Sequence, residues 1–416
     1  MANSVIPYGK QSISQDDIDA VVEVLQSDYL TQGPKVKEFE EAFAEYVGAK
    51  YAVAVANGTA ALHLNALALG VREGDKVITT PITFAASANC IRYCGGEVVF
   101  ADIDPDTYLL DIAKVRALLE ADKKKQIKGI IPVDFAGRSV NMEAFRSLAD
   151  EFNCWIIEDA CHAPGAFFEN SRGEKIKAGS GIYADLAIFS FHPVKHIAAG
   201  EGGMITTNNS ELYDKLLKLR THGITKNEDE FSNSVDIAIG EAQHSTFNIQ
   251  HYPSWYMEMH SLGYNYRMPD INCALALSQL QRADEGLKSR HRIAKRYFDA
   301  FQNIPQVIDR NHEHMSLITD HQSHYYQVGH AHHLYVVEVE DRLGLYNYLR
   351  EHQVYAQIHY VPTHLMPYYQ SLGNKEGEHV NAEAYYAKCI SLPMYPTLTE
   401  EEQDFVINSV LSFYNG

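Results

Sequence analysis

The sequence predicts an α/β fold built on a mostly parallel, doubly wound sheet. From about residue 50 to residue 208, short β-rich runs alternate with stretches that are apolar at helical spacing. Most of the short runs are almost continuously apolar, which is typical of strands that helices cover on both faces. Ligands of such folds bind at the carboxyl ends of the strands, so functional side chains are expected at that edge.

The elements of this sheet follow one another along the chain. The segment TAALHLNALALG closes at Gly70 and FAASANCIRYCGG closes at a glycine pair, and glycine commonly ends a helix. Seven segments are predicted to be the strands: 52–56, 76–80, 97–103, 129–135, 154–160, 184–191 and 203–207.

A smaller α+β unit is predicted to follow the sheet. The expected elements are a helix over 211–222, an irregular stretch over 224–260, one long amphipathic helix over 274–301, a strand at 334–339, a helix near 341–352, a strand at 354–360 and a last helix from about 400. We therefore expect an N-terminal arm (1–20), a large domain (21–260) and a smaller C-terminal α+β domain (261–416).

Composition narrows the class of protein. The chain has 416 residues and a formal net charge of −19, which argues against nonspecific binding to nucleic acid or to an anionic membrane surface. It contains no apolar run long enough to span a bilayer, and MANSVIPYGK lacks the pattern of a signal peptide. Its six cysteines form no CxxC pair and are interpreted as buried thiols of a reducing compartment, which predicts a cytoplasmic protein.

Histidines are concentrated in one stretch near the C-terminal unit. Seven of the twenty lie between His312 and His333. Their spacing matches no zinc pattern and no cysteine joins them, so we expect a polar surface loop and no metal site.

A lysine on a turn raises the question of chemistry. Lys195 stands in SFHPVKHIAAGEGG, after an apolar run and ahead of a glycine pair. A loop lysine is usually only solvated, but a buried, partly deprotonated one is a nucleophile toward carbonyl groups. The most demanding partner of such a lysine is pyridoxal 5′-phosphate (PLP), which also needs a carboxylate, a flat apolar group and a phosphate cradle.

The chain offers an ordinary residue for each of these needs. Asp159 ends the apolar strand of WIIEDACHAPGA, although it could equally be an acidic strand end that caps a helix. Gly58 and Thr59 open a helix directly after a strand, where N–H groups and the helix dipole favour a phosphate. Ser190 offers a hydroxyl to that phosphate, and Phe84 offers a ring, although a phenylalanine in this position is more often core.

In their order along the chain, these motifs resemble the DegT/StrS family of sugar-nucleotide aminotransferases, which have PLP-dependent transferase fold type I. The resemblance covers essentially the whole chain, in YLTQGPKVKEFEEAFAEYVGAKYAVAVANGTAAL, TPITFAASAN, PVDFAG, EDACHAPGA, SFHPVKHIAAGEGG, LGYNYRMPDINCALALSQL, HLYVVEV and IHYVPTHLMPYY. Within the family, the chain is most similar to the branch that makes pseudaminic acid precursors.

The resemblance implies a role for each cofactor-site residue. Lys195 carries the cofactor covalently and shuttles the proton, Asp159 pairs with the pyridine nitrogen, and His162 lies near the ring hydroxyl. Phe84 packs on the ring. The phosphate is held by Gly58, Thr59, Ala60 and Ser190, and by Asn265 of a neighbouring subunit, which predicts a homodimer with shared active sites.

The resemblance also implies a nucleotide-sugar site. Its residues are Tyr8, Asp28, Tyr29, Leu30, Thr31, Asn57, Ser190, Asn265, His333, Leu334, Tyr335, Val336, His359 and Tyr360. The segment HLYV is also interpretable as a plain core strand, and we hold that interpretation for Leu334 and Val336. Strand alternation then turns His333 and Tyr335 to the opposite face, toward ligand.

Two details refine the expected activity. This chain has NGTAAL and AAGEGG where the family more often has SGTAAL and TTGEGG, which suggests a slightly looser turn. Relatives that act as 3-dehydratases carry histidine at the position of Lys195, so the lysine favours transamination. The expected reaction passes an amino group from L-glutamate to C4 of a UDP-linked 4-keto-6-deoxyhexose. A GDP-perosamine synthase, another 3- or 4-aminotransferase and a non-catalytic PLP-binding regulator are the alternatives.

Overall fold

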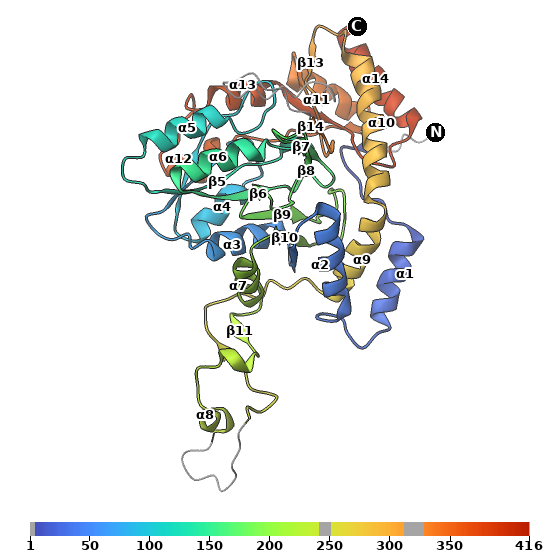
Figure 1. The fold of residues 1–416 in the computed structure, drawn as a ribbon. Helices are drawn as coiled ribbons and strands as arrows, with labels where there is room; N and C mark the ends of the chain where they lie inside the picture. Colours follow the sequence, from blue (N-terminus) through green and yellow to red (C-terminus); the bar gives the residue numbers. More distant parts are fainter. Residues whose placement is uncertain (1–4, 241–250, 312–327, 416) are drawn as a thin grey trace.

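A seven-stranded sheet forms the centre of the computed structural model, which describes residues 5–240, 251–311 and 328–415 (Figure 1). The strands lie in the order β2-β10-β9-β6-β5-β3-β4. All pairs are parallel except those of β10, which is antiparallel to both β2 and β9. The seven predicted strands are therefore confirmed, with ends that shift by a few residues: β2 (Tyr51–Val55), β3 (Lys76–Thr79), β4 (Glu97–Phe100), β5 (Ile127–Ile131), β6 (Trp155–Asp159), β9 (Leu186–Ser190) and β10 (Gly203–Thr207).

Helices cover both faces of this sheet, as its apolar strands require. One apolar cluster joins α3 (Gly58–Ala68), α4 (Ala86–Tyr93) and α7 (Ser210–Arg220) to the sheet. A second cluster contains α5 (Ile112–Ala121) and α6 (Met142–Phe152), and a third contains α2 (Pro34–Val47) and α9 (Asp270–Gln281). Both faces of the sheet are buried, which explains why its strands have apolar side chains on both faces.

The predicted smaller α+β unit is built on a second, three-stranded sheet. The order is β13-β15-β17, and a separate apolar cluster packs α10, α11 and α14 against these strands. Its elements are α10 (Ala283–Phe301), β13 (Val307–Asp309), β15 (Tyr335–Val339), α11 (Arg342–Glu351), β16 (Val354–Tyr355), α12 (Pro367–Ser371), α13 (Val380–Lys388), β17 (Cys389–Leu392) and α14 (Glu400–Asn415). The N-terminal β1 (Ile6–Pro7) pairs in parallel with β16, so the start of the chain belongs to this unit.

The prediction of one helix over 274–301 is wrong. The helix is broken into α9 and α10 at Arg282, whose φ of −117° and ψ of 16° are not helical. The side chain of Arg282 donates to the carbonyl of Ser12 and to the carboxylate of Asp17, far away in sequence. Contacts with the N-terminal segment hold Arg282 at this break, and periodicity within 274–301 carries no sign of them.

Two smaller groups of strands are separate from the main sheet. One contains β14 (Val328–Gly329), β7 (Phe167–Glu169) and β8 (Lys175–Lys177). The other pairs β11 (Ile224–Thr225) with β12 (Glu258–Met259), and with α8 (Val235–Ile239) it forms a projection that extends away from the sheet (Figure 1). Part of the predicted irregular stretch 224–260, residues 241–250, lies outside the described residues.

Two further expectations concern the whole chain. The six cysteines are free: four are buried, and Cys94 and Cys161 are partly buried. In the described parts of the chain, no helix has the length and apolarity that crossing a bilayer requires. The expected domain boundaries remain a proposal, and α1 (Gln15–Leu25) runs through the one at residue 20.

Helix α1 docks on α9 through a buried carboxylate. Asp17 has no exposed surface, and its oxygens accept hydrogen bonds from Ser278 Oγ at 2.6 Å, from Gln279 Nε2 at 2.7 Å and from Arg282. Burial alone would raise the pKa of Asp17, but hydrogen bonds from Ser278 and Ser14 and the charge of Arg282 together lower it below the usual value. The carboxylate is therefore an ion at neutral pH and ties the N-terminal helix to the α9–α10 junction.

We predict that Asp17→Ala lowers the free energy of unfolding by about 2 kcal/mol, because Ser278, Gln279 and Arg282 lose a buried acceptor. Asp16→Ala is the matched control, since Asp16 is exposed on the same helix. Because the folded-state pKa of Asp17 is lowered, its contribution is present at neutral pH and is lost as the pH falls below about 4. Urea unfolding at pH 7 and near pH 3 measures both effects. An equal loss at the two pH values would contradict the ionic role.

Candidate active site

The carboxyl ends of the central strands open into a cavity of about 430 Å³. The parallel pairing of β6 with β9 sets Asp159 opposite Ile188, so the ends of both strands reach the same edge of the sheet. Twelve of the residues predicted for cofactor or substrate line this cavity: Tyr8, Asn57, Gly58, Thr59, Phe84, Asp159, His162, Ser190, Lys195, His333, His359 and Tyr360.

Lys195 sits on a tight turn that directs its amine into the cavity. Its backbone N–H donates to the His192 carbonyl at 2.8 Å, and Ala199 N–H closes the loop on the Phe191 carbonyl at 2.8 Å. Its Nζ lies 3.5 Å from Nε2 of His333. Burial lowers the pKa of Lys195 from its ordinary value, against the opposite effect of Cys161 and Asp159. The uncharged, nucleophilic amine is therefore easier to reach than in a solvated lysine.

Asp159 is held in place by a serine that the sequence analysis did not single out. Ser87 Oγ donates to Asp159 Oδ2 at 2.6 Å, and the N–H of Cys161 donates to Oδ1 at 3.2 Å. Thr83 Oγ1 lies 2.8 Å from Ser87 Oγ. Because Ser87 gives its one proton to the carboxylate, Thr83 is the donor to Ser87. Ser87 lies within the TPITFAASAN motif, but only the folded chain brings α4 to the end of β6.

The neighbouring carboxyl group, Glu158, serves a different purpose. Strand alternation turns it away from Asp159, and it is buried with Asp134. Burial, and the closeness of the two carboxyl groups, raise the pKa of Asp134 well above its ordinary value, and burial also raises that of Glu158. Asp159 lines the cavity, whereas neither of these two carboxyl groups does.

The start of α3 forms one corner of the cavity. Ala60, which was also predicted for the phosphate, does not line the cavity, and its N–H already donates to the Asn57 side chain that caps the helix, at 2.8 Å. The helix itself supplies no acceptor for the N–H groups of Gly58 and Thr59. A side chain at position 58 would place its Cβ 3.0 Å from Ser190 Cβ, so glycine lets the backbone lie this close to Ser190 without displacing it.

Buried imidazoles form the wall opposite this corner. The rings of His162 and His333 lie 4.2 Å apart, and the Tyr360 hydroxyl lies 3.4 Å from His162 Nε2. Burial lowers the pKa of His162 and of His333 well below the ordinary value, and the Lys195 charge lowers both further. His359, whose Nδ1 lies 2.9 Å from Ser391 Oγ, also has a pKa lowered by burial, to about 3. These rings are neutral and offer hydrogen bonds without charge.

Several predicted site residues do not line this cavity. Asp28, Tyr29, Leu30 and Thr31 are exposed, as is Asn265.

The placement of Tyr335 by strand alternation is wrong. Its ring packs against Tyr297 and its hydroxyl donates to Asp309, in the core of the smaller unit. β15 has apolar neighbours on both faces, so neither face is free for ligand. Leu334 and Val336 are core residues as expected.

The expectation of a polar surface loop is wrong for the last histidines of the rich stretch. His330, His332 and His333 are buried, because the N–H of Ala331 pairs with the Gly137 carbonyl and α10 packs behind them. Residues 312–327, with the other histidines, lie outside the described residues. In the described chain, no group of three His, Cys, Asp or Glu side chains is arranged to hold a metal ion.

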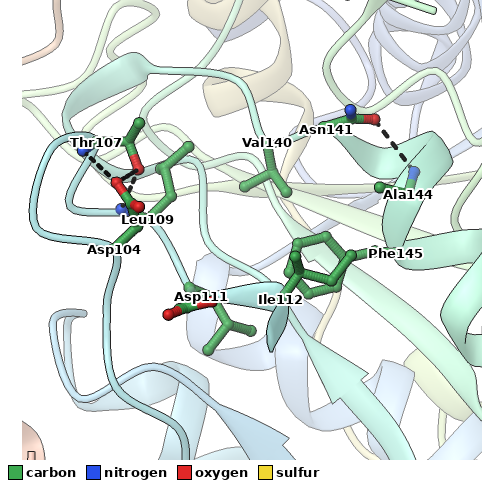
Figure 2. Close-up of a pocket in the computed structure, with 10 residues that line it drawn as sticks. Asp104, Thr107, Leu109, Asp111, Ile112, Val140, Asn141, Ala144 and Phe145 are labelled. Carbon is green, nitrogen blue, oxygen red and sulfur yellow. Dashed lines mark hydrogen bonds between the residues drawn. The ribbon is translucent and has the colours of Figure 1, made fainter. Parts of the chain in front are cut away.

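A second hollow, of about 80 Å³, is lined by Leu109, Ile112, Phe145 and neighbouring residues (Figure 2). Its polar groups are already engaged: Asp104 accepts from Thr107, and Asn141 caps α6 through the N–H of Ala144. The polar groups of this hollow therefore stabilise the local fold, and none of them is left free for a reaction.

The large cavity fits PLP group by group. A buried lysine amine, a fixed carboxylate across from it and free N–H groups at a helix start are the three requirements of that cofactor. His162 Nδ1 is buried with no hydrogen-bond partner among the described residues, and Phe84 is 63% exposed at the cavity rim, so both are available to a ligand. The site and the fold together define a PLP-dependent enzyme of fold type I.

Comparison with known proteins narrows the class. Residues 11–411 match the model of the DegT/DnrJ/EryC1/StrS aminotransferase family, and the chain belongs to this family. It is 37% identical to the spore coat polysaccharide biosynthesis protein SpsC of Bacillus subtilis, over 100% of this chain and 98% of SpsC. It is 36% identical to the UDP-4-amino-4,6-dideoxy-N-acetyl-β-L-altrosamine transaminase of Campylobacter jejuni serotype O:2, over 98% and 97% of the two chains.

Solved structures agree with this assignment. Helicobacter pylori PseC, an aminotransferase of pseudaminic acid biosynthesis, superposes with a TM-score of 0.82 at 29% identity, over 99% of this chain and 100% of PseC. The PLP form of Spr1654 from Streptococcus pneumoniae superposes with a TM-score of 0.81 at 27% identity, over 99% of each chain. The protein is a PLP-dependent sugar aminotransferase, as its sequence predicted.

We predict that Ser87→Ala weakens PLP binding about tenfold, because a hydrogen bond to a charged group is worth roughly 1.5 kcal/mol or more. Thr83→Val should act in the same direction and more weakly, since it removes only the donor to Ser87. Ser147→Ala, which removes an exposed hydroxyl bonded to the Glu143 carbonyl, is the control. Absorbance titration of the cofactor-free protein with PLP measures the affinity. Wild-type affinity in Ser87→Ala would show that Asp159 needs no such support.

Proposed function

We propose that this enzyme transfers an amino group from L-glutamate to C4 of a nucleotide-linked 4-keto-6-deoxyhexose, UDP-2-acetamido-2,6-dideoxy-β-L-arabino-hex-4-ulose. The observation that carries the proposal is the pairing of a buried Lys195 with Asp159 inside one cavity of about 430 Å³. The likeness over nearly the full chain to the altrosamine transaminase and to PseC supports the choice of sugar. Free cysteines support a reducing compartment, and we place the enzyme in the cytoplasm.

The roles of the chain's own residues follow from their positions. Bound PLP supplies an electron sink for the substrate carbon. We assign Asp159 to the ring nitrogen, and Gly58, Thr59 and Ser190 to the phosphate, because the start of α3 offers N–H donors there. Lys195 holds the cofactor and then carries the proton, since burial makes its uncharged form accessible.

The sugar end of the cavity is lined by aromatic rings with polar tips. Tyr8 lies 5.2 Å from the His359 ring, and the Phe84 ring lies 6.4 Å from that of Tyr360. These groups can contact a sugar with apolar surface and hydrogen-bond its hydroxyls. His333 lies against Lys195, so we expect its loss to impair both half-reactions and not the sugar step alone.

The diphosphate of the substrate needs cations or N–H donors, and the cavity wall has few of them. Among the described residues that line the cavity, Lys195 is the one lysine or arginine. We infer that groups outside this wall, including Asn265 and the segment Asp28–Thr31 of a neighbouring subunit or of a closed form, complete the site.

A homodimer with shared sites accounts for the exposed features of the chain. Asn265 is exposed and lies outside the cavity wall of its own chain. The projecting segment carries exposed apolar side chains, which are costly to leave in water and are typical of interaction surfaces. They are Ile237, Trp255, Met257, Met259 and Leu262.

A different nucleotide sugar is the second candidate. SpsC, a spore coat polysaccharide protein, is as similar to this chain as the altrosamine transaminase is. The experiment below therefore also tests two alternative activities, that of a GDP-perosamine synthase and that of a 3-aminotransferase. The intact Lys195–Asp159 pair disfavours a non-catalytic regulator.

We predict that the purified enzyme aminates the UDP-linked 4-keto sugar with glutamate at a kcat/KM at least about tenfold above that for a GDP-linked 4-keto sugar, because hydrogen-bonding sites discriminate strongly. Mass spectrometry of the product detects the amine, and NMR assigns it to C3 or C4. Lys195→Ala is the inactive control, and borohydride should fix PLP on Lys195 in the wild type. Preference for the GDP sugar, or amination at C3, would overturn the choice of substrate.

We predict that inactive Lys195→Ala and inactive Asn265→Asp chains, unfolded and refolded together, regain about a quarter of wild-type activity per dimer. Half of the dimers are then hybrids. One site of each hybrid has both native residues, and the other site has both substitutions. In the Asn265→Asp chain alone, a carboxylate faces the phosphate and disables the site by repulsion. Refolding each variant alone is the control. A monomer in sedimentation, or no recovery despite proven hybrid formation, would rule out the shared site.

A further inference from the structure

A buried guanidinium lies behind the catalytic lysine. Arg290, on α10, is 2% exposed, and its Nη1 donates to the carbonyls of His332 at 3.1 Å, His333 at 3.2 Å and Met394 at 3.1 Å. All three acceptors belong to the main chain. Among the described residues, no carboxylate pairs with Arg290. Burying an unpaired cation is costly, so its retention requires a compensating use.

The carbonyls that Arg290 holds belong to the segment that reaches the lysine. His333 is the residue whose Nε2 lies 3.5 Å from Lys195 Nζ. The next residue of α10 acts on the same segment, since His291 Nε2 donates to the His330 carbonyl at 2.7 Å. Two consecutive side chains of α10 therefore fix the main chain of residues 330–333, and with it the imidazole that touches Lys195.

The charge of Arg290 also reaches the lysine. Both residues line a cavity of about 230 Å³ on the side of Lys195 that faces α10. After burial, Arg290 is a further cause of the lowered pKa of Lys195. Burial lowers the pKa of Arg290 itself to about 9, which leaves it cationic at neutral pH.

We propose that Arg290 is a positioning residue for the transamination: it clamps the main chain of His332 and His333 so that His333 stays against Lys195, and its unpaired charge favours the uncharged amine. The proposal concerns the chemistry common to the family and does not depend on which sugar the enzyme uses. Arg290 would then act on Lys195 Nζ in two ways, through the position of His333 and through its own positive charge.

Other groups also act on that amine and must stay constant in a test. Asp159 and Cys161 lie at the end of β6, His162 lies on the turn that follows, and His196 lies on the lysine's own loop. His333 and His359 come from the smaller unit. Lys10, Arg282 and Glu285 line the cavity of about 230 Å³ that Lys195 shares with Arg290. Arg290→Lys and Arg290→Met both remove the clamp and leave these other residues chemically unchanged, so the difference between the two variants isolates the charge at position 290.

The test measures the amine itself in the full-length chain freed of cofactor. Trace acetylation by acetic anhydride at a series of pH values, with mass spectrometry of the Lys195 peptide, gives the apparent pKa of this lysine. We expect Arg290→Met to raise that pKa, because a nearby positive charge is removed. Arg290→Lys keeps the charge and should leave the pKa near that of the wild type. Arg296→Met is the matched control, since Arg296 on the same helix pairs with Asp404 at the surface.

The clamp is tested separately from the charge. A lysine at position 290 cannot reproduce the planar fork of arginine, so Arg290→Lys should lower kcat of the glutamate half-reaction on the order of tenfold through displacement of His333. A folded Arg290→Met chain with an unchanged Lys195 pKa would overturn the effect of charge. If Arg290→Met does not fold, Arg290→Lys still decides the clamp, because a wild-type rate in that variant would overturn it. The labelling contains no sugar, so its outcome is independent of the proposed substrate.

Discussion

The parallel register of β6 against β9 sets the position of the reactive groups in the cavity. It aligns Asp159 with Ile188, so that the chain leaving β9 passes beside the carboxylate and then turns to present Lys195. A one-residue slip of β6 would direct Glu158 into the cavity and Asp159 into the sheet packing. The register is fixed because both faces of β6 are buried, and a slip would exchange its apolar and acidic residues. The chemistry therefore depends on the packing of strands that contain few polar groups.

The parallel pairing of β5 with β6 brings three acidic side chains close together, and only one of them, Asp159, lines the cavity. Asp134 and Glu158 are buried side by side, and burial raises the pKa of both. The raised pKa of Asp134 favours its uncharged form, which limits the repulsion between this pair and Asp159. The cavity is lined by the neutral imidazoles of His162 and His333, so this part of its wall offers hydrogen bonds without charge in a chain with a net charge of −19.

Much of this arrangement could be predicted from the sequence, because it depends on local signals. The strands follow from apolar runs, and the order of NGT, EDA and SFHPVK along the chain identifies the family and the pair Lys195–Asp159. What could not be predicted depends on contacts between distant segments. Ser87 is one more serine in a helix until α4 lies against β6, and the helix break at Arg282 coincides with contacts to Ser12 and Asp17, which are distant in sequence. The sequence places the Tyr335 side chain wrongly, because strand alternation predicts which residues share a face of β15 but not which other elements cover that face.

The histidines of residues 330–333 show how the smaller unit completes the site of the larger one. This segment passes so close to the turn after β5 that the N–H groups of Ala331 and Leu334 pair with the carbonyls of Gly137 and Ala136. Gly137 has a φ of +101°, and a Cβ there would lie 2.8 Å from the His162 carbonyl and 2.9 Å from the His332 nitrogen. A side chain at position 137 would therefore push apart the two backbone segments that carry His162 and His333. The close contact of those rings beside Lys195 requires a residue without a side chain at this crossing.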